Sequence, residues 1–285
     1  MKLFEKSLFI HKIVALKYGY EIEIKKSFLH ESVASAHRQE IESKNEKHLI
    51  FDDFLKKNKQ SSLEEIVSYG KSLFQTTCDA DEDIVLYRYT YFIENGNYID
   101  CGANHPINYN VTKIFYDKGW RGINIEPVEK LICQYEAVRS GDINLSCCVS
   151  DKDTIMTFYE SLDGASGLSS LEESHKAHVN SVKGWEDIQF VEYNVECKTL
   201  NSILKRYPLQ NIIFLKIDVE GHEKNVLQGV DLEKYKPWII MLEHNPNLHE
   251  CENILENNGY VSLASYKHNR FYILNEKKDY IFERI

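Results

Sequence analysis

One short stretch restricts the fold of this chain more than any other: an apolar strand, then an acid, then a glycine. The strand is predicted at 98–99, the acid is Asp100 and the glycine is Gly102. Apolar spacing over 107–115 predicts a helix after this turn, and a second apolar strand is predicted at 123–125. A unit of this kind is typical of α/β proteins that bind nucleotides at the carboxyl ends of parallel strands.

The residues around this turn predict a nucleoside ligand that lacks phosphate. Gly102 has no Cβ, so the backbone there can approach a ligand closely. Glu126 follows the second strand, and an ionised carboxylate can accept hydrogen bonds from both hydroxyls of a ribose. Asn104 and Ile107 stand where a dinucleotide fingerprint has its second and third glycines. The second glycine admits a pyrophosphate, so the pattern favours S-adenosylmethionine (SAM) over a dinucleotide.

Ionisable side chains follow two later apolar runs, 212–217 and 238–242, which we expect to be buried parallel strands. They are Asp218, Glu220, His222 and Glu223 after the first run, and Glu243 and His244 after the second. Because such strand ends meet at one edge of a sheet, we expect these groups to cluster. The candidate catalytic residues are Asp218, Glu220, His222 and Glu243. The candidate general bases are His222, whose ordinary pKa lies near neutral pH, Asp218 and Glu220.

Further elements are expected along the chain. A strand over 143–149 places Ser150 and Asp151 at its tip, where a side-chain acceptor would meet the adenine of a ligand already held by Asp100 and Glu126. Another strand is predicted at 154–160. A helix is expected to begin after Thr199, which can cap it, and the chain is expected to end in an antiparallel pair, 260–266 with 270–274.

Composition limits the partners and the location. The net charge of −10 argues against a nucleic-acid partner, which would need a basic face. The seven cysteines show no C-x-x-C spacing, which favours a reducing, cytoplasmic location. No apolar run reaches the roughly 18 residues of a membrane span. Residues 1–75 are charged and helical in pattern and are expected to form a cap or a homodimer element, while 76–285 are expected to form the catalytic domain.

The chain resembles the FkbM family of class I SAM-dependent methyltransferases over about residues 80–275. The segments that carry the resemblance are 98–106, 111–113, 119–127, 149–151 and 215–223. The resemblance implies a Rossmann-like α/β fold with a mostly parallel seven-stranded sheet and a C-terminal antiparallel hairpin, following an N-terminal helical extension. It implies O-methylation of a sugar hydroxyl, nucleotide-linked or glycan-linked, in bacterial polysaccharide or capsule biosynthesis.

The same resemblance implies a set of cofactor-binding residues. They are Asp100, Gly102, Ala103, Asn104, Glu126, Pro127, Ser150, Asp151 and Asp218. Within this set Glu126 would hold the ribose, and Ser150 and Asp151 would lie near the adenine. The turn that carries Asp218 would face the methyl group and the acceptor.

The sequence leaves three alternatives open. Asp218, Glu243 and His244 are expected to meet at neighbouring strand ends, where they would bind Mg²⁺ or Mn²⁺ and lower the pKa of sugar hydroxyls. An NAD(P)-dependent sugar oxidoreductase is the rival enzyme class, against which the missing second glycine argues. A SAM-binding scaffold without turnover is the rival outside enzymes, against which the intact acid cluster 218–223 argues.

Overall fold

The computed structural model describes residues 42–76, 78, 80–162, 166–244 and 247–285. Residues 50–285 form one compact unit. Most of the expected N-terminal extension lies outside the described residues, and its role as a cap or dimer element stays a prediction. Within the described residues, no helix combines the length and the apolar character that crossing a membrane demands.

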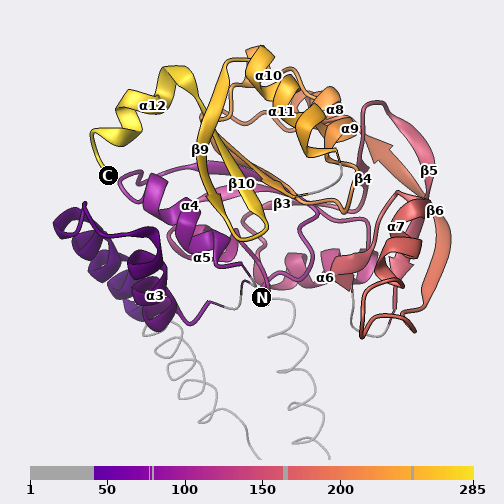
Figure 1. The fold of residues 1–285 in the computed structure, drawn as a ribbon, viewed down its shortest axis with the longest axis horizontal. Helices are drawn as coiled ribbons and strands as arrows, with labels where there is room; N and C mark the ends of the chain where they lie inside the picture. The colour runs from indigo at the N-terminus through magenta and orange to yellow at the C-terminus, as the bar shows by residue number, and fades with distance from the viewer. Residues whose placement is uncertain (1–41, 77, 79, 163–165, 245–246) are drawn as a thin grey trace, which may run out of the picture. The chain divides into compact units, whose positions relative to one another are not determined.

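A seven-stranded sheet forms the centre of this unit (Figure 1). Its order is β3 (Ile143–Leu145), β2 (Arg121–Ile125), β1 (Asn97–Cys101), β7 (Ile212–Ile217), β8 (Ile239–Glu243), β10 (Asn269–Leu274) and β9 (Tyr260–Tyr266). The first five strands are parallel, and β10 runs antiparallel to both of its neighbours. The expected fold class, including the C-terminal hairpin, is confirmed.

Helices cover both faces of the sheet, as Figure 1 shows. One face is covered by α8 (Leu200–Arg206), α9 (Glu223–Gln228), α10 (Leu232–Tyr235) and α11 (Leu248–Asn257); the other is covered by α3 (Leu63–Phe74), α4 (Glu82–Thr90) and α5 (Lys113–Asp117). Successive side chains of a strand point to opposite faces. Ile99 and Cys101 therefore pack in the hydrophobic core on the side of α8 to α11, and Tyr98 packs in the core on the side of α3 to α5. Burial on both faces explains why β7 and β8 read as continuous apolar runs.

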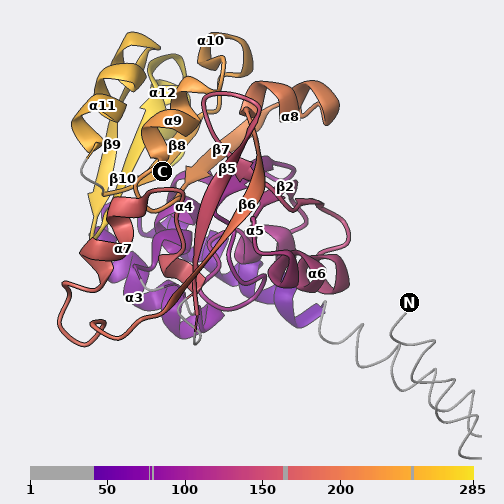
Figure 2. The same ribbon diagram turned by 90° about the vertical axis from the view of Figure 1, so that its right-hand side faces the viewer.

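A second, three-stranded sheet stands beside the first (Figure 2). Its order is β4 (Cys148–Val149), β6 (Phe190–Lys198) and β5 (Thr154–Ser161). The 3-10 turn η1 (Ser166–Leu168) and helix α7 (Glu173–Val179) lie between β5 and β6 in the chain, and α6 (Glu129–Val138) follows β2. The strand expected over 143–149 is therefore wrong as one element, because it divides into β3 and β4 and these pair in different sheets.

The helix expected over 107–115 is also wrong over most of its length. Only Lys113–Asp117 is helical, and Ile107, which the helical spacing places on the buried face, is 47% exposed. Side-chain hydrogen bonds replace the helix here. Asn110 Nδ2 donates to Ala103 O (3.0 Å), His105 Nδ1 accepts from Ile107 N (3.1 Å), and Asn110 Oδ1 accepts from the distant Arg139 (2.8 Å). The helix capped by Thr199 is confirmed, since the Thr199 side chain accepts from Ser202 N. The C-terminal helix α12 (Asn275–Phe282) is an addition to the expected elements.

Candidate active site

The register of four strands aligns one row of residues at the carboxyl edge of the main sheet. Cys101 is opposite Ile125 in β2 and Ile217 in β7, and Ile217 is opposite Leu242 in β8. The residues that follow these four positions are Gly102, Glu126, Asp218 and Glu243. The sequence-predicted groups at these strand ends are thus brought to a single edge.

Gly102 allows the ends of β1 and β7 to approach each other. Its φ is +75°, and a Cβ at this position would lie 1.8 Å from the carbonyl oxygen of Asp218. Asp218 N also donates to Cys101 O (3.1 Å). The sequence suggested that a ligand makes the close approach; in the structure the backbone of the neighbouring strand end makes it. Any side chain at 102 would push Asp218 out of place.

A cleft lies above this edge. It is lined by Gly102, Asn104, Tyr109, Ile125, Glu126, Pro127, Cys147, Cys148, Val149, Phe158, Gly167, Ser169, Ser170, Leu171, Lys216, Asp218, Val219 and Glu220. One side combines carboxylates with an ammonium group, and the side formed by β4 and β5 is apolar.

Glu126 fastens the loop that follows β1. Its Oε2 accepts from Asn104 N (2.9 Å) and its Oε1 from Val128 N (3.0 Å). The side chain is nearly buried, and burial raises its pKa to about 7. Each carboxylate oxygen has a second lone pair, so Glu126 can accept from a ligand while it holds the loop.

Lys216 is a residue that the sequence analysis missed. Its Nζ donates to Gly102 O (2.9 Å) and lies 3.1 Å from Asp100 Oδ1 and 3.3 Å from Asp218 Oδ2. Burial alone lowers the pKa of this lysine, but the charges of Asp100 and Asp218 outweigh burial and raise the pKa above its usual value. A lysine inside a buried apolar strand is almost always paired, and that was the available signal.

Arg139 is the second residue that was missed. It is fully buried after α6 and holds together the loop beneath the cleft. Its guanidinium donates to Asp142 (3.1 Å), Asn110 (2.8 Å), Thr112 (2.9 Å), Asn124 (3.3 Å) and the hydroxyl of Tyr98. Thr112 Oγ1 in turn donates to Asp100 Oδ2 (3.0 Å). Asp100, which is itself buried, is therefore fixed by Thr112 on one oxygen and by Lys216 on the other.

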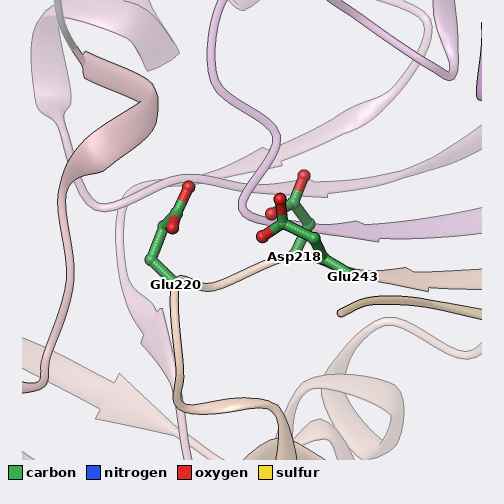
Figure 3. A group of neighbouring side chains, drawn as sticks. All are labelled: Asp218, Glu220 and Glu243. Carbon is green, nitrogen blue, oxygen red and sulfur yellow. The ribbon is translucent and has the colours of Figure 1, made fainter. Parts of the chain in front are cut away.

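Asp218, Glu220 and Glu243 form the acidic cluster of the site (Figure 3). One oxygen from each of these carboxylates lies within 4.8 Å of the others. Burial, followed by the charge of Asp218, raises the pKa of Glu220 to about 9 and that of Glu243 to about 10. His244, expected beside Asp218 and Glu243, is exposed and outside this group, and Glu220 occupies the third position instead.

Six other predicted residues lie outside the cleft lining. Asp100 is fully buried, and Glu243 belongs to the acidic cluster without lining the cleft. His222 is 2% exposed and does not line the cleft. Ser150 is buried, Asp151 is exposed and Ala103 is buried; none of the three lines the cleft either. The apolar wall is formed by residues just before Ser150, namely Cys147, Cys148 and Val149, together with Phe158.

The raised pKa values predict how stability varies with pH. A carboxyl whose folded pKa lies above its ordinary 4.5 stabilises the fold at low pH, and this contribution is lost as the pH rises toward the folded pKa. The free energy of unfolding of the ligand-free protein should therefore fall between pH 5 and 9, by at most about 1.4 kcal/mol per pH unit per group. In Glu243→Gln this fall should be shallower, as urea unfolding at pH 5, 7 and 9 would measure.

The control is Glu233→Gln, which changes an exposed glutamate in α10 and should keep the wild-type slope. Parallel curves for Glu243→Gln and wild type would contradict the raised pKa of Glu243.

Fold and site together define a class of protein. A sheet of this order, a glycine turn after β1 and an acid after β2 are those of a Rossmann-like methyltransferase. Residues 100–262, more than half of the chain, match the methyltransferase FkbM domain. The chain therefore belongs to the FkbM methyltransferase family. No curated protein matched the sequence.

Proposed function

We propose that this methyltransferase uses SAM and transfers its methyl group to a hydroxyl of a sugar. The observation that carries the choice of cofactor is the charge of the cleft. Its lining includes the carboxylates of Glu126 and Asp218, and among the described lining residues the only lysine or arginine is Lys216, which is already paired with Asp100 and Asp218. A sulfonium cation suits such a site, whereas the pyrophosphate of NAD(P) would face these carboxylates beside a cation that is already neutralised.

The lining residues fit the parts of SAM. Glu126 would accept from the ribose hydroxyls, and the apolar wall of Cys148, Val149 and Phe158 would contact the adenine. Asp100 contributes through Lys216, which it helps to hold beside Asp218. SAM supplies an electrophilic methyl group when bound.

The acceptor hydroxyl needs a group that takes its proton, because a neutral alcohol is a poor nucleophile. Asp218 fits this role, because it lines the cleft, is partly exposed and is paired with Lys216 through Oδ2. At neutral pH Glu220 and Glu243 retain their protons, since their pKa values are about 9 and 10. Glu220, which lines the cleft, can therefore donate a hydrogen bond to a sugar oxygen while the Asp218 carboxylate accepts the proton.

The cofactor assignment is tested by calorimetric titration of the protein with SAM and, separately, with NAD. Wild type should bind SAM and not NAD. Glu126→Ala should weaken SAM binding by about 30-fold or more, because charge-assisted hydrogen bonds are worth roughly 2 kcal/mol. Glu126→Gln, which keeps the shape of the side chain, should show a smaller loss. The control is Glu129→Ala, an exposed position at the start of α6; tight NAD binding by wild type would reverse the assignment.

A divalent metal is the second candidate component of the site. Three carboxylates within 4.8 Å of one another offer the oxygen ligands that Mg²⁺ and Mn²⁺ prefer. The ligand set would be Asp218, Glu220 and Glu243, rather than the set with His244 that the sequence suggested. A methyl-transfer assay with and without a chelator tests this, and so does Glu220→Gln, which removes a ligand yet imitates the protonated acid.

The acceptor class rests on the family resemblance and on the acidic cluster, since carboxyl groups accept from and donate to sugar hydroxyls. We infer a role in bacterial polysaccharide or capsule assembly in the cytoplasm. SAM turnover against a panel of nucleotide-linked and glycan-linked sugars is the direct test. Absence of turnover with every acceptor, together with tight SAM binding, would favour a scaffold.

A further inference from the structure

His222 has both ring nitrogens engaged away from the cleft. Its Nε2 lies 2.9 Å from Ser150 Oγ and its Nδ1 lies 2.7 Å from Glu172 Oε1. The ring is almost completely buried and does not line the cleft. A general base must reach the proton that it removes, and His222 has no such access.

These contacts join three separate parts of the chain. Ser150 directly follows β4, His222 lies in the turn between β7 and α9, and Glu172 directly precedes α7. His222 therefore connects the main sheet to the second sheet and to residues 167–172, the wall segment of the cleft.

A second contact fastens the wall segment to the same turn. Ser170 is 2% exposed, and its Oγ donates to the carbonyl oxygen of Glu220 (2.7 Å) and accepts from Glu172 N (2.9 Å). On its other side Ser170 pairs with Tyr159 of β5 through two backbone hydrogen bonds, of 2.9 and 3.1 Å. The wall segment is thus fixed between β5 and the turn that carries Glu220.

The wall segment closes one side of the cleft. Gly167, Ser169, Ser170 and Leu171 are among the lining residues. A Cβ added to Gly167 would lie 3.3 Å from Asn104 Nδ2, so this end of the segment meets the loop that follows β1. The distance between these two sides decides how tightly a ligand is enclosed.

We propose that His222 is a positioning residue that holds the wall segment against the Glu220 turn and thereby sets the affinity for the cofactor. It acts through Glu172 and Ser150 and takes no proton from the acceptor. This inference rests on the proposed function, because the cofactor is taken to be SAM. It replaces the role of general base that the sequence alone allowed for this histidine.

The test separates binding from turnover. His222→Ala and Glu172→Ala should each raise KM for SAM about tenfold with kcat changed less than threefold, which is the signature of lost binding without lost chemistry. His222→Gln, which keeps a polar group near Ser150, should recover part of the affinity. The double variant should lose no more affinity for SAM than the more severe single variant, because both substitutions break the same contact between His222 and Glu172. The control is His249→Ala, an exposed histidine in α11.

A readout without cofactor distinguishes the two proposals. Amide hydrogen exchange over 169–172 should be about tenfold faster in His222→Ala than in wild type, because the segment loses a fixing hydrogen bond. Unchanged exchange, or loss of kcat with unchanged KM, would overturn the inference. A wild-type protein that binds no SAM would overturn the proposed function. The comparison of hydrogen exchange between wild type and His222→Ala would still decide whether His222 holds the wall segment. Glu172 is 40% exposed at its side chain, so its variant serves if His222→Ala fails to fold.

Discussion

Asp218→Asn should lower kcat for methyl transfer by about 10²- to 10⁴-fold, the usual contribution of a positioned general base. Asparagine has nearly the same shape, so the contacts of the strand end persist, but its amide has no affinity for the acceptor proton. The affinity for SAM should change only a few-fold, because Lys216 still pairs with Asp100 (3.1 Å). Single-turnover kinetics at saturating SAM, together with calorimetric titration, would measure the two quantities separately.

The matched control is Glu220→Gln, in the same turn. At neutral pH Glu220 carries a proton, since its pKa is raised to about 9, and a glutamine imitates that state. We therefore expect kcat to fall less than about tenfold. Equal and severe losses in both variants, together with stimulation by added Mn²⁺ of the wild type but of neither variant, would instead indicate a metal site. Wild-type activity in Asp218→Asn would remove the acid cluster from the chemistry.

Arg139→Ala should lower the free energy of unfolding by about 3 to 5 kcal/mol, the cost of leaving a buried charge without its partner. The charge left behind is Asp142, whose side chain is as fully buried as that of Arg139. Thr112 and Asn110 lose a donor as well. Urea unfolding at one pH would measure the loss. The dependence of the unfolding free energy on urea concentration should be the same in variant and wild type, which would show that the two unfold to a similar denatured state.

Arg139→Lys should recover only part of this stability, because a lysine ammonium cannot reproduce the planar fork that reaches five partners. Arg206→Ala, at an exposed position in α8, is the control and should change stability by less than about 0.5 kcal/mol. An Arg139→Ala protein as stable as this control would show that the buried network is replaceable.

Several features of the fold were predictable because they follow from local pattern. Continuous apolar runs at 212–217 and 238–242 require burial on both faces, which only a central parallel strand provides. The residue after each run then lies at the carboxyl edge of the sheet. The convergence of Glu126, Asp218 and Glu243 at one edge was therefore predictable from strand order alone, whereas their catalytic and binding roles are still predictions.

Long-range contacts decided what the pattern did not show. The helix expected over 107–115 yields to a loop that Arg139 holds by donating to Asn110 Oδ1 (2.8 Å), a contact across 29 residues that no periodicity encodes. Lys216 and Arg139 matter because of partners that are distant in sequence, such as Gly102 for the first and Tyr98 for the second. Pairing of this kind exists only after the chain has folded.

The turn after β7 shows most clearly what the sequence predicts and what only the folded backbone decides. From the sequence, Asp218, Glu220 and His222 form one cluster of ionisable groups at a strand end. In the structure Glu220 and Gly221 both have positive φ, of 55° and 101°, so the chain reverses there and sends neighbouring side chains in different directions. Glu220 joins the acidic cluster and His222 turns inward to Ser150 and Glu172. The sequence determined which chemical groups reach this edge of the sheet; the backbone of the five-residue turn between β7 and α9 determined which of them face the cleft.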